Sequence, residues 1–381
     1  MHYLDANASE PLRPEAFEAM TAAFAITGNP SSVHAAGRAA RRLLEDARER
    51  IAATFGARAQ DVVFTSGGTE ADALAVHALG PGRRLIVGAT EHDAVRSAAE
   101  SLAGCSVVAA TQGCSGDLVD LPVDRDGVAD LDSLRRLLAS GSPALVCLML
   151  ANNETGTIQP IAEAAALCRA HGALLHVDAV QAAGRVAVDL AQIGCDSLAL
   201  SAHKLGGPMG IGCLLLSGER SAISPLIAGG GQERGRRGGT QAVPAIAGFA
   251  AVCGLGSDQT RIAALRDRAE LAAMRMGAVV CGGGAARLAN TTSLALPGVR
   301  ADTQVMALDL DGIAVSAGAA CSSGKVQTSR VLTAMGLGDL AGQAIRVSLP
   351  WNVTEAAIQA FEAAYRRMAA NARRTLVPAA A

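Results

Sequence analysis

Leu198-Ala-Leu-Ser201-Ala202-His203-Lys204-Leu-Gly206-Gly207-Pro208 is the stretch around which the chain is organised. Its short apolar run ends in a polar tetrapeptide and a glycine-rich turn. This pattern predicts a buried strand that delivers Ser201, His203 and Lys204 to its carboxyl end. Lysine plus arginine number 33, yet Lys204 and Lys325 are the only lysines. Because only an amine can form a Schiff base with an aldehyde, the retained Lys204 indicates a chemical role. The alternative is that arginine dominates through genome composition and Lys204 persists by chance.

Length and composition indicate a globular enzyme. The chain has 381 residues, of which 50% are hydrophobic and 18% charged, and its formal net charge is -2. This length suggests about two domains with a large core. No basic stripe with interleaved aromatic residues is present, so no nucleic-acid partner is expected. The start of the chain, Met1-His-Tyr-Leu-Asp5, has no signal-peptide pattern, and no apolar run is long enough to span a bilayer. We therefore expect a cytoplasmic protein without a membrane partner.

The nine cysteines do not form a metal or disulfide pattern. Their number is odd and no two have the two-residue spacing of a zinc or redox pair, so no metal site is predicted. Cys147 and Cys213 fall inside apolar runs and are predicted to be reduced and buried. Cys321 differs, because alanine, serine and glycine flank it, which predicts an exposed thiol on a mobile loop.

Strand and helix patterns alternate from about residue 60 to 215, which predicts a mostly parallel α/β sheet with helices on both faces. In such sheets ligands lie off the carboxyl ends of the strands. Polar residues follow each predicted strand at this end: Gly68 and Thr69, His92, Asn153, Asp178 and Gln181, and Ser201, His203 and Lys204.

Individual members of this set have ordinary explanations as well. The strand, glycine turn and helix start around Ser66–Glu70 present backbone N–H groups to an anion, or form a simple tight turn. His92 is a candidate stacking residue or a helix cap. Arg346 lies in a strand pattern, where an arginine is usually edge-exposed but is also able to clamp a carboxylate. The glycine-rich segment 229–240 is a surface linker, or a segment that approaches a ligand or a second subunit closely.

The composition changes after residue 256, where a charged amphipathic helix is predicted over residues 258–275. We expect a large domain over residues 15–256. Residues 1–14 and 257–381 are expected to form a smaller α+β domain that carries the Cys321 loop.

The chemistry of these residues matches pyridoxal 5'-phosphate, which needs a lysine, a carboxylate, a phosphate cradle and a ring-stacking partner. Lys204 supplies the amine, and Asp178, on the neighbouring strand, would pair with the pyridinium nitrogen. The remaining candidates are Gly68, Thr69, Ser201 and His203 for the phosphate, His92 for stacking, and Asn153 and Gln181 for the ring oxygen.

The sequence resembles the cysteine desulfurases of the class V aminotransferase family, which have the type I fold of pyridoxal-phosphate enzymes, and the resemblance covers essentially the whole chain. The motifs that carry it are Tyr3-Leu-Asp-Ala-Asn-Ala8, Gly28-Asn-Pro-Ser-Ser-Val-His34, Thr65-Ser-Gly-Gly-Thr-Glu70, Glu91-His92, Asn152-Asn-Glu154, His176-Val-Asp178-Ala-Val-Gln181, Ser201-Ala-His-Lys204, Gly229 to Thr240, Ala320-Cys321 and Ile345-Arg346-Val-Ser348.

This resemblance implies roles for the site residues. Lys204 would carry the cofactor and move the Cα proton, His92 would stack on the ring and transfer protons, and Arg346 and Asn153 would orient the substrate carboxylate. Cys321 would attack the sulfur of L-cysteine, forming a persulfide and leaving L-alanine. Thr240 would reach the phosphate of a second subunit, which implies a homodimer. The sulfur would pass to an acceptor protein such as an iron–sulfur scaffold.

Two departures from the family pattern and several alternatives remain. The segment Ser316-Ala-Gly-Ala-Ala320 is less hydroxyl-rich than expected, and Gly68-Thr69 replaces the usual Ala-Thr. A selenocysteine lyase or another β-eliminating relative is one alternative. An inactive scaffold homologue is another, against which the retained Lys204, Asp178 and Cys321 argue. Nitrogenase maturation, housekeeping cluster assembly and tRNA thiolation all stay open as destinations of the sulfur.

Overall fold

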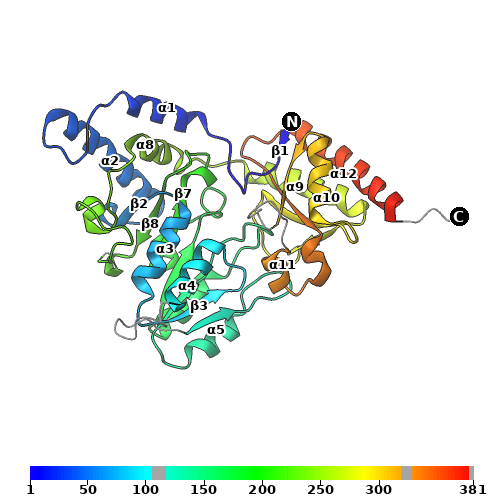
Figure 1. Ribbon diagram of the computed structural model, residues 1–381, viewed down its shortest axis with the longest axis horizontal. Coiled ribbons are helices and arrows are strands. Elements are labelled where there is room, and N and C mark those ends of the chain that lie inside the picture. Colours follow the sequence, from blue (N-terminus) through cyan, green and yellow to red (C-terminus); the bar gives the residue numbers. More distant parts are fainter. Residues whose placement is uncertain (105–116, 221, 319–327, 377–381) are drawn as a thin grey trace.

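A seven-stranded sheet forms the centre of the computed structural model, which describes residues 1–104, 117–220, 222–318 and 328–376 (Figure 1). In spatial order its strands are β2 (Val62–Thr65), β8 (Gly212–Leu216), β7 (Ser197–Ser201), β6 (Leu174–Asp178), β5 (Ala144–Cys147), β3 (Arg84–Gly88) and β4 (Leu118–Leu121). Only β8 runs against its neighbours, and every other pair is parallel. The predicted mostly parallel α/β sheet is confirmed.

Helices cover both faces of this sheet because its strands are apolar on both sides. Along β5, Leu145 and Cys147 join one hydrophobic cluster, whereas Val146 and the following Leu148 join the other. This alternation follows from the two-residue period of a strand. The covering helices are α3 (Gly68–Leu79), α4 (Asp93–Gly104), α5 (Leu131–Leu138), α6 (Ile161–Ala170) and α7 (Leu190–Ile193).

Three helices pack together beside the β2–β8 end of the sheet: α1 (Pro14–Phe24), α2 (Ala35–Thr54) and α8 (Val243–Val252) (Figure 1). Pro14 occupies the first turn of α1, where its missing N–H costs nothing. Large apolar side chains nevertheless remain exposed around this group, among them Phe17, Phe24 and Val33.

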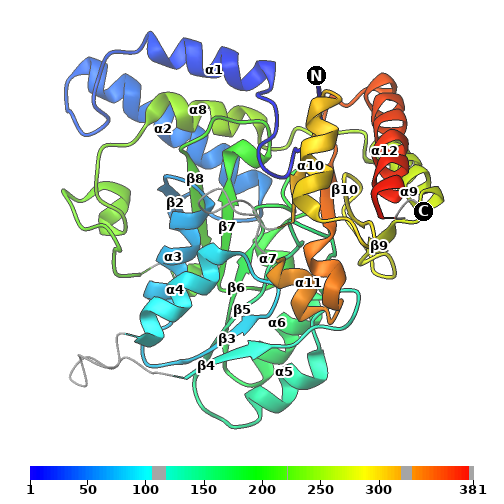
Figure 2. The ribbon, with the colours of Figure 1, turned by 45° about the vertical axis from the view of Figure 1, so that its right-hand side comes forward.

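A second, four-stranded antiparallel sheet lies beside the first, in the order β12 (Ser316–Ala317), β13 (Ala344–Ser348), β10 (Thr291–Ala295) and β9 (Val279–Cys281) (Figure 2). Its helices are α9 (Gln259–Arg275), α10 (Ala301–Leu310), α11 (Arg330–Ala334) and α12 (Glu355–Leu376). The amino-terminal strand β1 (His2–Tyr3) pairs with β11 (Ile313–Ala314).

The large sheet and the second sheet each have a hydrophobic cluster of their own. Leu4 of the amino-terminal arm packs in one cluster with Phe361 and Tyr365 of α12, whereas Leu288 packs in the cluster of the large sheet. The domain boundaries expected near residues 14 and 256 remain a prediction. Among the described residues, no helix combines the length and the apolar character needed to cross a membrane.

Candidate active site

A cavity of about 350 Å³ opens where the carboxyl ends of β5, β6 and β7 meet the arm and the second sheet. It is lined by the residues expected at the strand ends together with Arg346: Gly68, Thr69, His92, Asn153, Asp178, Gln181, Ser201, His203 and Lys204. Strands far apart in sequence therefore deliver one set of polar groups to one place. Thr240 does not line this cavity, and Cys321 and Lys325 lie outside the described residues.

Lys204 ends a single 3₁₀ turn, Ala202–Lys204, that directly follows β7. Its Nζ donates hydrogen bonds to the backbone oxygens of Asn7, at 2.5 Å, and Ala8, at 3.0 Å, both in the amino-terminal arm. Burial, together with the charges of Arg346 and Arg185, lowers the pKa of the Lys204 amine to about 7. A substantial fraction of the amine is therefore neutral near neutral pH, the form that attacks an aldehyde.

Asp178 lies at the end of β6, which pairs with β7 as expected. Its Oδ1 accepts a hydrogen bond from the backbone N–H of Val180 at 2.8 Å. Burial raises the pKa of Asp178, while the charges of His92 and Lys204 oppose that rise. A carboxylate held in this low-dielectric position is suited to pair with a cationic ring nitrogen.

Asp72 is a second carboxyl in the cavity wall, and sequence reasoning missed it. Burial first, and then the charges of Asp178 and Glu91, raise the pKa of Asp72 well above its ordinary value, so the folded protein favours the protonated form of this carboxyl. Its Oδ1 lies 3.1 Å from Nε2 of His176, whose pKa burial lowers to about 3. The spacing in the sequence was a signal for it: Asp72 follows Thr69 by about one turn of α3, so the two residues lie on the same face of that helix.

The turn between β2 and α3 has the features of a phosphate cradle. Gly68 begins the 12-residue helix α3, so unpaired backbone N–H groups and the positive end of the helix face the cavity. Ser201 Oγ is buried at this turn and has no hydrogen-bond partner within the described residues. A Cβ added at Gly68 would lie 2.7 Å from Cγ2 of Val180, which gives a steric reason for glycine at this departure from the family pattern.

The two cavity histidines are oriented by local contacts. His92 Nδ1 accepts a hydrogen bond from the backbone N–H of Ala94 at 3.1 Å, so His92 caps α4 and lines the cavity as well. His203 Nδ1 lies 3.2 Å from Oγ of Ser9, and burial, aided by the Lys204 charge, lowers the pKa of His203 to about 4. His203 is therefore a neutral hydrogen-bonding group at neutral pH.

Arg346 is buried in the middle of the second sheet. It is only 4% exposed and lies in β13, between β12 and β10. The edge-exposed alternative is wrong because three neighbouring segments surround the guanidinium. Nη2 lies 2.8 Å from Oδ1 of Asp5, and Nη1 donates to the backbone oxygen of Asn153 at 3.1 Å. Nε is buried without a hydrogen-bond partner within the described residues.

The glycine-rich segment 229–240 is firmly anchored rather than a loose surface linker. Glu233 and Arg234 have positive φ angles, of 48° and 58°, which non-glycine residues adopt at some energetic cost. The buried Glu233 carboxylate holds this conformation through Arg48, whose Nη1 and Nη2 lie 2.7 and 2.9 Å from its oxygens. Thr240, at the end of the segment, is exposed.

Arg237 connects the segment 229–240 to the turn between β2 and α3, called the phosphate turn below. Its guanidinium donates to both carboxylate oxygens of Glu70, at 2.7 and 3.2 Å, and Glu70 Oε2 accepts the backbone N–H of Ser66 at 2.7 Å. This bidentate pair fixes the position of the turn relative to the segment that carries Thr240.

Comparison with known proteins identifies the family of this chain. The aminotransferase class-V family model matches residues 2–361. A cysteine desulfurase of Cereibacter sphaeroides is 44% identical over 93% of this chain and 92% of its own, and an IscS-like cysteine desulfurase of Mycobacterium tuberculosis is 39% identical over 100% and 99%. The solved structure of a NifS-like protein from Rickettsia africae superposes with a TM-score of 0.84, at 32% identity, over 97% of this chain and 99% of that one. The chain belongs to the class-V aminotransferase family, within its group of cysteine desulfurases.

Proposed function

We propose that this protein is a pyridoxal-phosphate-dependent cysteine desulfurase that converts L-cysteine to L-alanine and transfers the sulfur to Cys321 as a persulfide. The observation that carries the proposal is the convergence of Lys204, Asp178 and Arg346 on one cavity. An amine, a buried carboxylate and a guanidinium around a cavity of this size match an aldehyde cofactor together with a small amino acid. The membership of the chain in the cysteine desulfurases supports the choice of L-cysteine as substrate.

The residues present fit pyridoxal phosphate in chemistry and in position. The unpartnered Ser201 Oγ and the free N–H groups at Gly68 and Thr69 suit a phosphate, and Asp178 suits the pyridinium nitrogen. His92 would stack on the ring, while Asn153 and Gln181 would bind its oxygen. When bound, the cofactor supplies an electron-withdrawing ring that stabilises negative charge at the substrate Cα.

The chain's own residues would perform the remaining work. Arg346 binds the substrate carboxylate and orients the Cα–H bond, while the neutral Lys204 amine removes and later returns the Cα proton. The Cys321 thiolate attacks the substrate sulfur, so that an S–S bond forms and the Cβ–S bond breaks. The electron pair of that bond remains on Cβ, which takes up a proton to become the methyl group of alanine.

A homodimer accounts for features that one chain leaves incomplete. Phe17, Phe24 and Val33 are 62%, 70% and 86% exposed beside α1 and α2, and such grouped apolar exposure is typical of an interface. Thr240 is exposed outside its own cavity, as expected of a residue that contacts the phosphate of the partner subunit. We further propose the domain division at residues 14 and 256, a cytoplasmic location, and transfer of the persulfide sulfur to an iron–sulfur scaffold or a related acceptor.

Replacing the two lysines separately tests the cofactor assignment. Lys204→Ala should abolish the yellow absorbance of the bound cofactor, and Lys325→Ala should leave it unchanged. The reverse result would overturn the proposed site.

Replacing Cys321 tests the nucleophile. Cys321→Ser should stop alanine production from L-cysteine, while the buried Cys253→Ser serves as a control for a general effect of losing a thiol. If Cys321→Ser still releases sulfide from L-cysteine at the wild-type rate, the assignment of the nucleophile is wrong.

A further inference from the structure

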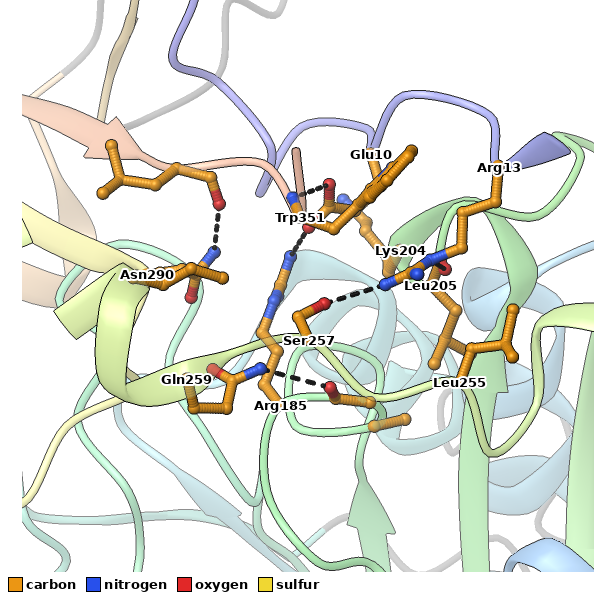
Figure 3. A pocket seen from close by; sticks show the side chains of 14 residues that line it. Glu10, Arg13, Arg185, Lys204, Leu205, Leu255, Ser257, Gln259, Asn290 and Trp351 are labelled. Atoms are coloured by element: carbon orange, nitrogen blue, oxygen red, sulfur yellow. Dashed lines mark hydrogen bonds and ion pairs between the residues drawn. The ribbon is translucent and has the colours of Figure 1, made fainter. Parts of the chain in front are cut away.

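Arg185 lies behind the cavity wall, and the proposed mechanism uses it only as one of the charges that lower the pKa of Lys204. It is 9% exposed and lines a small cavity of about 20 Å³ together with Glu10, Lys204 and Trp351 (Figure 3). It follows Gln181 by four residues in a turn that brings their side chains together. The guanidinium Nη1 donates to the backbone oxygen of Gln181 at 2.9 Å and to its side-chain Oε1 at 2.5 Å.

These contacts define which way the Gln181 amide faces. A guanidinium only donates hydrogen bonds, so the amide atom that faces Arg185 must be the oxygen. On its other side the amide donates from Nε2 to the backbone oxygen of Asn7 at 3.0 Å, and a carbonyl only accepts. Both partners therefore require the same orientation, and a flipped amide would lose both hydrogen bonds.

As a consequence, the Gln181 amide presents a hydrogen-bond donor to the cavity and not an acceptor. One of the two Nε2 hydrogens is used by Asn7, and the amide oxygen is held by Arg185. The other hydrogen is left for a ligand in the cavity that Gln181 lines. We propose that Arg185 is a positioning residue that locks Gln181 as an obligate hydrogen-bond donor to the ring oxygen of the cofactor, which favours the ionised form of that oxygen. This inference rests on the proposed function.

Glu10 provides the counter-charge that keeps Arg185 buried. Its Oε1 lies 3.2 Å from Nη2 of Arg185, and its Oε2 accepts the backbone N–H of Trp351 at 3.2 Å (Figure 3). The backbone N–H of Glu10 donates to the oxygen of His203 at 2.9 Å. An uncompensated buried guanidinium would be costly, so the pair also has a structural value that any test must separate from the positioning role.

The structural and positioning roles can be tested separately because only Arg185 contacts Gln181, whereas Glu10 contacts Arg185 and the backbone of Trp351. Glu10→Gln removes the counter-charge of a buried pair and should lower the free energy of unfolding, but it leaves the Arg185 donors on Gln181. The affinity of the folded, cofactor-free variant for pyridoxal phosphate should therefore change by less than about two-fold. The double variant Glu10→Gln/Arg185→Met removes the ion pair without leaving a buried carboxylate alone. Its affinity should fall about 10- to 100-fold, the loss of one hydrogen bond to a charged oxygen.

A double-mutant cycle then asks whether Arg185 acts through Gln181. In a Gln181→Ala background, adding Glu10→Gln/Arg185→Met should lower the affinity by less than about two-fold, since the amide to be positioned is gone. A loss as large as in the wild-type background would overturn the inference and leave Arg185 with a structural role only. Thermal unfolding of each cofactor-free variant reports on whether it has folded.

Reversing the polarity gives a sharper readout. Gln181→Glu is nearly isosteric, and Arg185 would hold its carboxylate so that an acceptor faces the ring oxygen. It should bind pyridoxal phosphate more weakly than Gln181→Ala does. Glu10→Gln/Arg185→Met should raise the pH at which the absorbance of the bound cofactor changes, and this rise should be larger in the wild type than in a Gln181→Ala background. The Arg185 charge beside Lys204 is lost in both backgrounds, whereas a donor to the ionised oxygen is lost only in the first. Equal or tighter binding by Gln181→Glu, or an equal absorbance shift in the two backgrounds, would contradict the inference.

The two proposals fail in different ways. If the wild-type protein does not bind pyridoxal phosphate, the proposed function is wrong. If the wild-type protein binds it and the mutational cycle is additive, only the role of Arg185 is wrong.

Discussion

Asp5 Oδ1 lies 2.8 Å from Nη2 of Arg346, and this ion pair joins the amino-terminal arm to the middle of the second sheet. The other carboxylate oxygen of Asp5 accepts the hydroxyl of Ser316 at 2.7 Å. Arg346 is thereby held from the side of the arm, while the backbone oxygen of Asn153 holds its Nη1. The guanidinium reaches the cavity in a defined orientation, as binding of a carboxylate with a specific geometry requires.

Arg346→Lys is expected to weaken substrate use although it preserves the charge. A lysine ammonium cannot reproduce the planar array of donors that Asp5, Asn153 and a substrate carboxylate share. We expect kcat/KM for L-cysteine to fall about 10- to 100-fold, with a raised KM, while pyridoxal-phosphate binding persists. Steady-state kinetics of the purified variant measure this. An unchanged KM would show that the substrate carboxylate binds elsewhere.

Asp72→Asn is expected to change how stability depends on pH. Because the pKa of Asp72 in the folded protein is raised, its favourable contribution is present below the ordinary carboxyl pKa and is lost as the pH rises toward the folded value. The asparagine amide of the variant cannot ionise, so the cofactor-free variant should gain stability over the wild type as the pH rises from the ordinary carboxyl pKa toward the raised folded value. The gain should be about 1.4 kcal/mol for each pH unit spanned by the shift.

Chemical denaturation of both cofactor-free proteins at several pH values measures this difference. Asp132→Asn is a matched control, because the Asp132 side chain is 74% exposed. A constant difference between wild type and Asp72→Asn across this pH range would contradict the assignment of the raised pKa to Asp72.

Gly68→Ala is expected to disturb the phosphate turn by steric conflict with Val180. The added Cβ would lie 2.7 Å from Val180 Cγ2, and a β-branched side chain has little rotamer freedom with which to move away. We expect a loss of about 1–3 kcal/mol in unfolding free energy and weaker pyridoxal-phosphate binding. The double variant Gly68→Ala/Val180→Ala should recover much of the binding.

Gly104→Ala at the end of α4 is the control for this series, because an added Cβ has open space there. If Val180→Ala does not rescue Gly68→Ala, the contact with Val180 is not the reason for glycine at this position. Unfolding curves and titration of the cofactor-free proteins with pyridoxal phosphate distinguish these outcomes.

Arg48→Met is expected to destabilise the segment that carries Thr240. The variant leaves the buried Glu233 carboxylate without its bidentate partner, which typically costs about 3–5 kcal/mol. We expect both a lower unfolding free energy and, if Thr240 contacts the phosphate in the proposed homodimer, weaker pyridoxal-phosphate binding. Arg300→Met is the control, since Arg300 is 74% exposed in its pair with Asp302, and no measurable change is expected. Similar effects of the two substitutions would show that Glu233 does not anchor the segment.

Much of the architecture was predictable because local patterns carry it. The buried runs before His92, Asn153 and Asp178 are strands, and their polar ends meet at one cavity because parallel strands end on the same edge of a sheet. The expected burial of Cys147 and Cys213 is confirmed. The strand patterns were less informative about Arg346, because a sequence does not show whether a strand lies at the edge of a sheet or between two neighbours.

The sequence by itself predicted the mostly parallel sheet and singled out Lys204 as the candidate reactive amine, because hydrophobic periodicity and residue chemistry are local properties. Tertiary structure alone decided the surroundings of that lysine. The backbone oxygens of Asn7 and Ala8 and the charges of Arg185 and Arg346 reach Lys204 from segments distant in the chain. Electrostatic fields and burial depend on distance in space, so the lowered pKa of the amine follows only from the folded chain.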